Sequence, residues 1–346
     1  MNRWMLAATL GVFVIGAATV WLGQKRPDEA AGPPAPTVDD RAAEETAARA
    51  AARDRPSDPA AHRRLAGALR RLARFAEAEG ALLRAIQLGL PQPEAQRDVV
   101  LLKAAQGDWP PTMDGLFQKV VRENPGDAEL LAAVAGAYSA KGRWREAEPL
   151  YTALLTREPG HAEWRFRRGT CRMREAFYAT AAEDFRAVLA HDHERYEARI
   201  NLANSLLGDA HMAAAERELL ACRAQRPAAP EPLIGLATCA VERGDFPAAE
   251  RFLDEAARLG GDSPLVLQER AALYLRQERT EQAIAVLKRL LELDPDHRQG
   301  HLQLSQAYTA AGNATAAAKH EAVYKELDRK EEERLAARRG MRSPDR

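Results

Sequence analysis

Residues 138–159 read YSAKGRWREAEPLYTALLTREP, and the spacing of large and small residues in this stretch decides the fold. A bulky apolar residue is followed by Ala three positions later, by a large apolar residue four positions after that, and finally by a Pro. The residues concerned are Tyr138, Gly142, Trp144, Ala147, Tyr151, Leu154 and Pro159. The same residue types return at multiples of 34 residues, as at Phe246, Ala249 and Leu253. Such a period predicts an array of stacked helical hairpins.

The residues in register resemble those of the tetratricopeptide repeat (TPR) family, whose hairpin is marked by W-x2-L-G-x2-Y, then A-x3-F, then A and a closing P. The resemblance covers most of the chain. The repeats are framed as residues 59–92, 93–127, 128–161, 162–195, 196–229, 230–263, 264–297 and 298–331. The resemblance implies an all-α fold, a right-handed α-solenoid of about eight TPR helical hairpins, which offers a surface for holding other molecules.

Two positions of the repeat require a small side chain, because helices approach closely there. The eighth position holds Ala66, Ala135, Gly169, Ala203, Ala237, Ala271 and Ser305. The second helix carries Ala78, Ala147, Ala181, Ala215, Ala249, Ala283 and Ala317. We expect Pro to end second helices at Pro159, Pro227 and Pro295. We expect a positive φ in the turn inside the hairpin at Gly107, Gly142, Gly244 and Gly312.

The pattern is interrupted in the second repeat, where Trp109 is followed by Pro110 and Pro111. One extra residue restores the register, which predicts a distorted turn and a less regular second helix. Before the first repeat, residues 37–56 have the pattern of half a repeat and are rich in Ala. They predict an N-terminal capping helix.

An uncharged stretch near the N-terminus predicts a membrane anchor. Trp4 to Leu22 is about 19 residues long and would span roughly 28 Å as a helix, close to the hydrocarbon thickness of a bilayer. Trp4 and Trp21 lie at its ends, as interfacial aromatic residues do. A cleaved signal peptide, the alternative, has a shorter apolar core. The prediction is an N-terminal tail at 1–3, a transmembrane signal anchor at 4–23 and a Pro/Ala-rich linker at 24–36.

The charges beside this stretch do not decide its orientation, because Arg3 and the α-amine on one side balance Lys25 and Arg26 on the other. A short tail before a first apolar helix is typical of a signal anchor that exports the chain behind it. We therefore expect a single-pass protein of the inner or plasma membrane of a bacterium, with an extracytoplasmic array; the alternative is a cytoplasmic array. Residues 332–346 predict a charged, partly disordered tail.

The overall charge gives no reason to expect a nucleic-acid partner, since acidic and basic residues balance at 50 each. A local excess of positive charge is expected on the first helix of the first repeat. It comprises Arg63, Arg64, Arg70, Arg71 and Arg74. This excess has two interpretations, a solvated helix face near anionic lipid head groups or a docking patch for an acidic partner segment.

The sequence contains no catalytic motif and no strong metal motif. Cys171, Cys222 and Cys239 are too few for a disulfide framework and fall at packing positions of the repeat, which predicts buried thiols. Two histidine pairs offer two ligands each: His191 with His193, and His297 with His301. Turns of a solenoid are polar by default, so we expect no metal. With no phosphate loop, nucleophile elbow or HExxH, we also expect no cofactor and no enzyme activity.

In the family that the chain resembles, first helices line the concave face, where clients commonly lie. The matching residues of the central repeats are Phe166, Arg167, Thr170, Arg174, Ile200, Asn201, Asn204, Ile234 and Thr238. An Asn amide both donates and accepts, so it can satisfy both polar groups of an extended peptide. The alternative is that Ile200 and Ile234 belong to the hairpin core and that Asn201 and Asn204 are solvated.

The combined pattern favours a membrane-anchored TPR scaffold or adaptor that binds a protein or peptide on its concave face. The Lys, Asn and Arg clamp of chaperone-binding relatives has no counterpart, since the groove positions contain no Lys. One alternative is a self-associating structural protein of the cell envelope, whose anchor pairs through Ala7 and Gly11. A second alternative is a regulatory subunit of a separate enzyme.

Overall fold

The computed structural model describes residues 37–107 and 109–340, with side chains up to residue 333. Within these ranges all regular secondary structure is helical. Contacts divide the described residues into an N-terminal unit, 37–175, and a C-terminal unit, 176–340. The boundary falls inside the predicted repeat 162–195, after its first helix.

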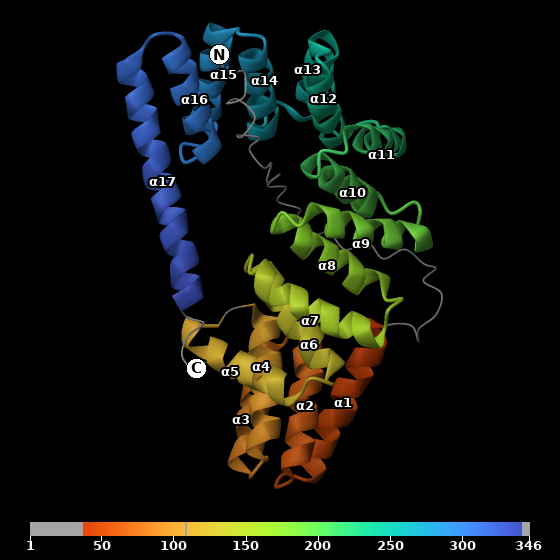
Figure 1. Ribbon diagram of the computed structural model, residues 1–346. Coiled ribbons are helices and arrows are strands. Elements are labelled where there is room, and N and C mark those ends of the chain that lie inside the picture. The colour runs from red at the N-terminus through yellow and green to blue at the C-terminus, as the bar shows by residue number, and fades with distance from the viewer. Residues whose placement is uncertain (1–36, 108, 341–346) are drawn as a thin grey trace. The chain divides into compact units, whose positions relative to one another are not determined.

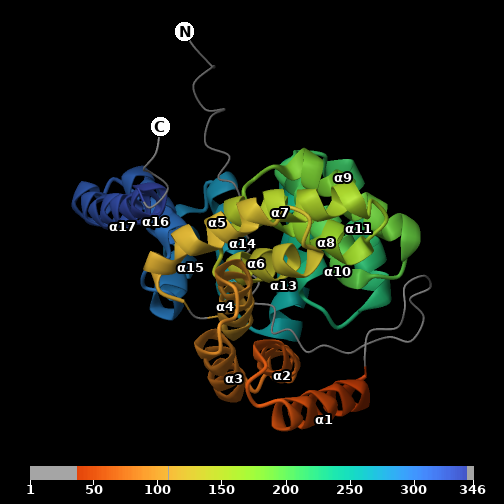
Figure 2. The same cartoon turned by 90° about the horizontal axis from the view of Figure 1, so that it is seen from below.

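The N-terminal unit is a succession of helices that pack in chain order (Figures 1 and 2). Its elements are α1 (Val38–Asp54), α2 (Pro59–Arg71), α3 (Phe75–Gln87), α4 (Gln92–Gln106), the 3-10 turn η1 (Pro111–Met113), α5 (Asp114–Glu123), α6 (Ala128–Ala140), α7 (Trp144–Arg157) and α8 (Ala162–Arg174). Helix α2 packs against α3 and also against α4, and α4 packs against α6. The first helices of successive hairpins therefore lie side by side, as stacking requires.

The C-terminal unit repeats the same neighbour pattern. Its helices are α9 (Tyr178–His191), α10 (Tyr196–Gly208), α11 (Met212–Gln225), α12 (Glu231–Arg243), α13 (Phe246–Gly260), α14 (Pro264–Arg276), α15 (Thr280–Leu293), α16 (Arg298–Ala310) and α17 (Ala314–Gly340). Each hairpin packs internally and against the next, and α10, α12, α14 and α16 form a row of first helices. Contacts only between neighbouring repeats define an all-α solenoid of the predicted kind.

The predicted packing positions are confirmed. All seven alanines of the second helices are buried, and Ala147, Ala215 and Ala249 are fully so. Large side chains surround them; in the C-terminal unit, Ala249 lies in one cluster with Leu253 and Leu273. Burial of apolar surface at near-crystalline density supplies the main stabilisation of such a stack.

The helix ends follow the sequence signals. Helices α7, α11 and α15 each end two residues before the predicted terminating Pro, at Arg157, Gln225 and Leu293. The Asp127 side chain caps α6 by accepting a hydrogen bond of 3.0 Å from the Leu130 N–H.

A single turn conformation recurs at the fifteenth position of every repeat. The predicted glycines have positive φ: Gly107, Gly142, Gly244 and Gly312 at 72°, 66°, 77° and 74°. The other four repeats place Ala73, Ala176, Ala210 and Glu278 there, at 58°, 62°, 58° and 60°. The left-handed region costs an L-residue energy that Gly does not incur. Four hairpins thus retain a strained turn that the sequence does not mark with Gly.

The distorted second repeat is also confirmed. The 3-10 turn η1 follows Pro110, and α5 has 10 residues where the other second helices of the unit have 13 or 14. The Trp109 ring stacks on Phe117 with centroids 4.7 Å apart, and its Nε1 donates to Asp114 over 3.0 Å. Arg143 Nη1 donates to both oxygens of Asp114, at 2.8 and 2.7 Å. This cluster replaces the packing that a longer helix would provide.

The two chain ends differ in what the structure describes. The predicted anchor, 4–23, lies outside the described residues, and within the described ranges no helix is both long and apolar enough to cross a membrane. At the other end, α17 continues past the predicted end of the last repeat at 331 as far as Gly340. Its surface carries i,i+4 ion pairs such as Lys325–Glu321, at 2.6 Å.

Candidate partner-binding surface

The predicted site residues of the N-terminal unit all lie on α8 and are half-buried. Arg167 Nε donates to Glu163 over 2.7 Å, one turn earlier on the same helix. Burial opposes the charge of Arg167, but Glu163 and Tyr151 outweigh it and raise the pKa of the guanidinium. Thr170 Oγ1 donates to the Phe166 carbonyl over 2.9 Å. Arg167 therefore keeps its charge, and the Thr170 hydroxyl is engaged within the helix.

Arg174, at the end of α8, differs from Arg167. Its guanidinium carbon lies 5.8 Å from the centroid of the Trp144 ring, in a cation–π arrangement. Burial lowers the pKa of Arg174. The residue is thus tied to α7.

The predicted site residues of α10 are half-buried, and two of them have side-chain amides that can bind a partner. Within the described part of the chain, the amide groups of Asn201 and Asn204 have no hydrogen-bond partner. The backbone carbonyl of Asn201, by contrast, accepts from Ser205 Oγ over 2.8 Å. These two amides can donate to and accept from an extended peptide. Ile200, beside them, is half-buried and adds apolar surface.

The predicted residues of α12 have a different environment. Ile234 is only 6% exposed and packs with Leu233, Ala256 and Val266, so its side chain belongs to the core. Thr238 is half-buried, and its Oγ1 lies 3.2 Å from the Ile234 carbonyl and 3.1 Å from Glu269 Oε2. The structure thus joins Thr238 to a carboxyl group on α14.

Glu269 is a residue that the sequence reasoning missed. It is 5% exposed, and burial raises its pKa to about 7 although the Thr238 hydroxyl favours the charged form. Glu269 comes two repeats after Asn201, at the same position of its own repeat. That register was the signal that could have found it: an acidic residue at an inward position of a helix that reads PLVLQERAALYLR.

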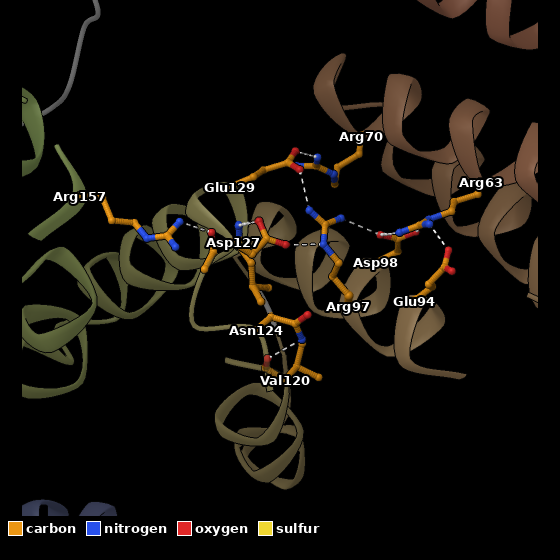
Figure 3. A network of polar contacts seen from close by, with 12 residues as sticks. Arg63, Arg70, Glu94, Arg97, Asp98, Val120, Asn124, Asp127, Glu129 and Arg157 are labelled. Atoms are coloured by element: carbon orange, nitrogen blue, oxygen red, sulfur yellow. Dashed lines mark hydrogen bonds and ion pairs between the residues drawn. The ribbon is translucent and has the colours of Figure 1, made fainter. Parts of the chain in front are cut away.

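The five arginines noted in the sequence are bonded within the N-terminal unit. Their partners are Glu94 and Asp98 for Arg63, the Ala60 carbonyl for Arg64, Glu129 for Arg70, Glu44 for Arg71, and Glu45 and Glu77 for Arg74. Figure 3 shows how several of these pairs connect into one chain that runs from α2 over α4 to the start of α6. Most of the local positive charge is therefore balanced by acids from neighbouring helices.

Arg97 is the centre of that chain (Figure 3). It donates to Asp98 over 3.0 Å, to Asp127 over 2.5 Å and to Glu129 over 3.1 Å. Burial opposes the charge of Arg97, but the three carboxylates outweigh it and raise its pKa. Burial likewise disfavours the charged form of Asp127, but Arg97 and the backbone N–H groups of Leu130 and Glu129 together outweigh it and lower the pKa of Asp127.

A cavity of about 550 Å³ lies beside this chain, and we name it the N-terminal cavity. It is lined by Glu44, Ala47, Ala48, Ala51, Ala60, Arg63, Arg64, Ala66, Gly67, Arg70, Arg71, Ala78, Leu82, Arg97, Asp98, Leu101, Leu102 and Glu129. Its walls thus come from α1 and the first helices α2, α4 and α6, with two residues of α3. The volume is that of ordinary ligand sites.

The thiols are buried, as predicted. Burial raises the pKa of Cys171 and of Cys222 to about 12 and that of Cys239 to about 11, so none is a reactive thiolate. In the described ranges, no group of three His, Cys, Asp or Glu side chains is arranged to hold a metal ion.

Two tetratricopeptide repeat models match the sequence, one at residues 41–93, 133–190 and 200–264 and the other at 265–307. Together these ranges cover more than half of the chain. The chain belongs to the tetratricopeptide repeat family. TPR folds are typically non-catalytic scaffolds that bind proteins, and the surfaces described above carry no catalytic constellation.

Solved TPR structures share the fold. A tetratricopeptide repeat protein from Parabacteroides merdae matches with a TM-score of 0.52 and 16% identity, over 70% of this TPR chain and 95% of that one. A chain of the APC/C hetero-tetramer Cut9–Hcn1 matches with a TM-score of 0.50 and 14% identity, over 84% of this chain and 56% of that one. The TPR chain thus spans little more than half of the latter protein. No curated protein sequence matches.

Proposed function

We propose that this TPR protein is an adaptor that binds extended segments of partner proteins along its rows of first helices. The observation that supports the proposal is the pair of half-buried amides, Asn201 and Asn204, whose polar groups have no partner in the described ranges. An extended peptide offers N–H and C=O groups that match both functions of an amide. Ile200 would add affinity by burial of apolar area.

The test is the double variant Asn201→Ala and Asn204→Ala. We expect the affinity for captured partners to fall by about 1–3 kcal/mol, because the bound peptide loses hydrogen bonds in a desolvated place. Gln225→Ala, an exposed polar residue at the end of the second helix α11, is the matched control. Equal capture by both variants and the unchanged protein would contradict the proposal for this surface.

The adaptor is proposed to act at a membrane, anchored by residues 4–23 with its repeats outside the cytoplasm. The support is the sequence alone: an uncharged stretch of bilayer length with Trp4 and Trp21 at its ends. Protease added to intact spheroplasts should then degrade the repeats. Repeats that resist the protease until the cells are lysed would place the array in the cytoplasm instead.

A further inference from the structure

The side chains that line the N-terminal cavity indicate which kind of ligand it binds. The charged side chains that line it are five arginines and three carboxylates, namely Glu44, Asp98 and Glu129. The two remaining acids of the ion-pair chain, Glu94 and Asp127, are not part of the lining. Arginines therefore outnumber carboxylates in the lining by two, but Glu94 and Asp127 balance Arg63 and Arg97 from outside it.

The ion pairs of the cavity fall into two classes. Asp98 has a side chain 15% exposed and is held by both Arg63 and Arg97, so it is part of the frame. Glu129 pairs with both Arg97 and Arg70, and the Arg70 side chain is only 13% exposed, so Glu129 belongs to the frame as well. Glu44 differs, because its side chain and that of its partner Arg71 are 50% and 34% exposed. An ion pair this exposed contributes only about 0–1 kcal/mol, so a carboxylate from elsewhere can replace Glu44 at little cost.

Arg64 provides a further unsatisfied charge. Within the described ranges its one hydrogen bond is long, 3.4 Å from Nε to the Ala60 carbonyl, and it has no carboxylate partner there. It projects from α2 one turn before Gly67 and two turns before Arg71. A guanidinium binds a carboxylate through two parallel N–H donors, which makes Arg64 and Arg71 a suitable pair for an acidic side chain.

The rest of the lining is small and apolar. Alanines of α1 and α2, together with Gly67, leave room close to the helix backbones, where a bulky lining would not. A Cβ added at Gly67 would meet only the Arg71 guanidinium, at 3.7 and 3.8 Å. An extended chain can therefore approach the floor while its side chains reach the arginines.

We propose that the N-terminal cavity binds an extended acidic segment of a partner protein, whose carboxylates replace Glu44 on Arg71 and engage Arg64. This inference rests on the proposed adaptor function and names the chemistry of one partner. Of the two interpretations of the α2 arginines, it selects the docking of an acidic segment, because Arg64 has no carboxylate partner in the described ranges and Arg71 has only an exposed one. Anionic lipid, the other interpretation, is an outcome of the test.

The experiment uses the full-length protein and a short fluorescein-labelled peptide in which Glu alternates with Ala, with a Gln-for-Glu peptide as the matched ligand. We expect the Glu peptide to bind at low ionic strength, with affinity that falls steeply as salt is added, and the Gln peptide to bind at least about tenfold more weakly. The double variant Arg64→Gln and Arg71→Gln should lose about tenfold in affinity for the Glu peptide. Arg84→Gln, an exposed residue of α3 outside the lining, should lose none.

Glu44→Gln separates recognition from folding. This change removes the internal competitor for Arg71, so the acidic peptide should bind several-fold more tightly, whereas a variant that merely loosens the fold would bind more weakly. Thermal melts of each variant verify that it is folded. Equal binding of the Glu and Gln peptides, or weaker binding by Glu44→Gln, would overturn the inference.

Two further outcomes have distinct meanings. If vesicles of anionic phospholipid bind through Arg64 and Arg71 and the Glu peptide does not, the surface is a lipid site and the inference is wrong. If no acidic peptide binds while partner capture still depends on Asn201 and Asn204, the inference fails and the adaptor function stands.

Discussion

At the scale of single residues, the C-terminal unit contains a carboxyl group in an unusual place. Glu269 is held on α14, 5% exposed, with Thr238 as its hydrogen-bond partner. The Thr238 hydroxyl has one proton, and its oxygen also lies 3.2 Å from the Ile234 carbonyl. A protonated Glu269 can donate to Thr238 while Thr238 donates to Ile234, so the neutral carboxyl completes the set of bonds. A charged Glu269 can accept the Thr238 proton only in competition with the Ile234 carbonyl, so this bond offsets only part of the effect of burial.

This arrangement predicts a pH-dependent stability. The pKa of Glu269 is about 7 in the folded chain and lies near 4.5 without burial. The folded state therefore binds more protons between these values, and stability falls as the pH rises through them. Glu269→Gln, which mimics the neutral form, should be more stable than the unchanged protein at pH 8 by on the order of 2–3 kcal/mol and similar to it at pH 4. Denaturation at both values measures the difference.

The pair His301 and His320 predicts the opposite dependence, in which stability falls as the pH decreases. His301 Nε2 lies 2.9 Å from the Pro295 carbonyl, which only accepts, so Nε2 carries the proton of neutral His301. Its Nδ1 then accepts from His320 Nδ1, 3.0 Å away, and the pair cannot hold two extra protons without opposing N–H groups. Burial first, then His301 and two lysines, lower the pKa of His320.

Because the folded pKa of His320 lies below its unfolded value near 6.5, its contribution is present above pH 6.5 and is lost as the pH falls. Acid should therefore loosen the hairpin of α16 and α17 first. Amide protection factors, which correct for the slower intrinsic exchange at lower pH, should fall in these helices as the pH is lowered from 7 to 5. In His320→Gln that change should shrink, and an undiminished change would show that the pair is not responsible.

At the scale of elements, the sequence predicts the position of every hairpin turn but the backbone conformation of only some of them. The 34-residue period located all the turns, and Gly at the fifteenth position correctly indicated a positive φ in four of them. It gave no sign that Ala73, Ala176, Ala210 and Glu278 adopt the same conformation, because the geometry is imposed by packing of the two helices rather than by local preference.

Relieving that strain should stabilise the protein. Ala210→Gly removes the cost of about 1–2 kcal/mol that the left-handed backbone conformation imposes on Ala. It adds a smaller cost in chain entropy, so we expect the free energy of unfolding to rise by about 0.5–1 kcal/mol. Gly244→Ala, in the next hairpin, should lose about 1 kcal/mol. Ala50→Gly, exposed within α1, should also lose about 0.5–1 kcal/mol because its φ is helical. A loss in Ala210→Gly would disprove the strain argument.

The ion-pair chain that joins α2, α4 and α6 could be predicted only in part. Several partners lie close to one repeat apart, such as Arg63 with Asp98 and Arg97 with Asp127, so the period does bring them onto neighbouring first helices. Arg70 and Glu129 are 59 residues apart, which no period of 34 indicates. Sequence alone also does not show how deeply each side chain is buried, and for that reason Glu269 was missed.

Removal of the central guanidinium tests the energetic role of the chain. Arg97→Met leaves Asp98, Asp127 and Glu129 close together with fewer donors, and we expect a loss of about 1–3 kcal/mol in the stability of the N-terminal unit. The control is Lys119→Met, whose pair with Glu123 has side chains 48% and 50% exposed, with an expected change within about 0.5 kcal/mol. Urea denaturation compares them. Equal effects would mean that the chain of Figure 3 stabilises no more than a surface pair.

At the scale of the whole molecule, the sequence supplied the fold class and the rows of first helices, since each repeat buries its apolar face against its neighbours. The sequence predicted less of the binding surface. For Ile234 the sequence left open whether it faces a partner or the hairpin core, and it lies in the core, while the N-terminal cavity was indicated only by its arginines. Cavities depend on the shape left between helices, and this shape is a property of the assembled stack.

Site-specific photo-crosslinking in the native cell examines whether clients lie along the first helices. A photoreactive residue is placed at Asn204, on α10, or at Leu220, an exposed residue on the second helix α11. We expect protein adducts from position 204 and few or none from position 220. Adducts from position 220 with none from position 204 would contradict binding on the first-helix face.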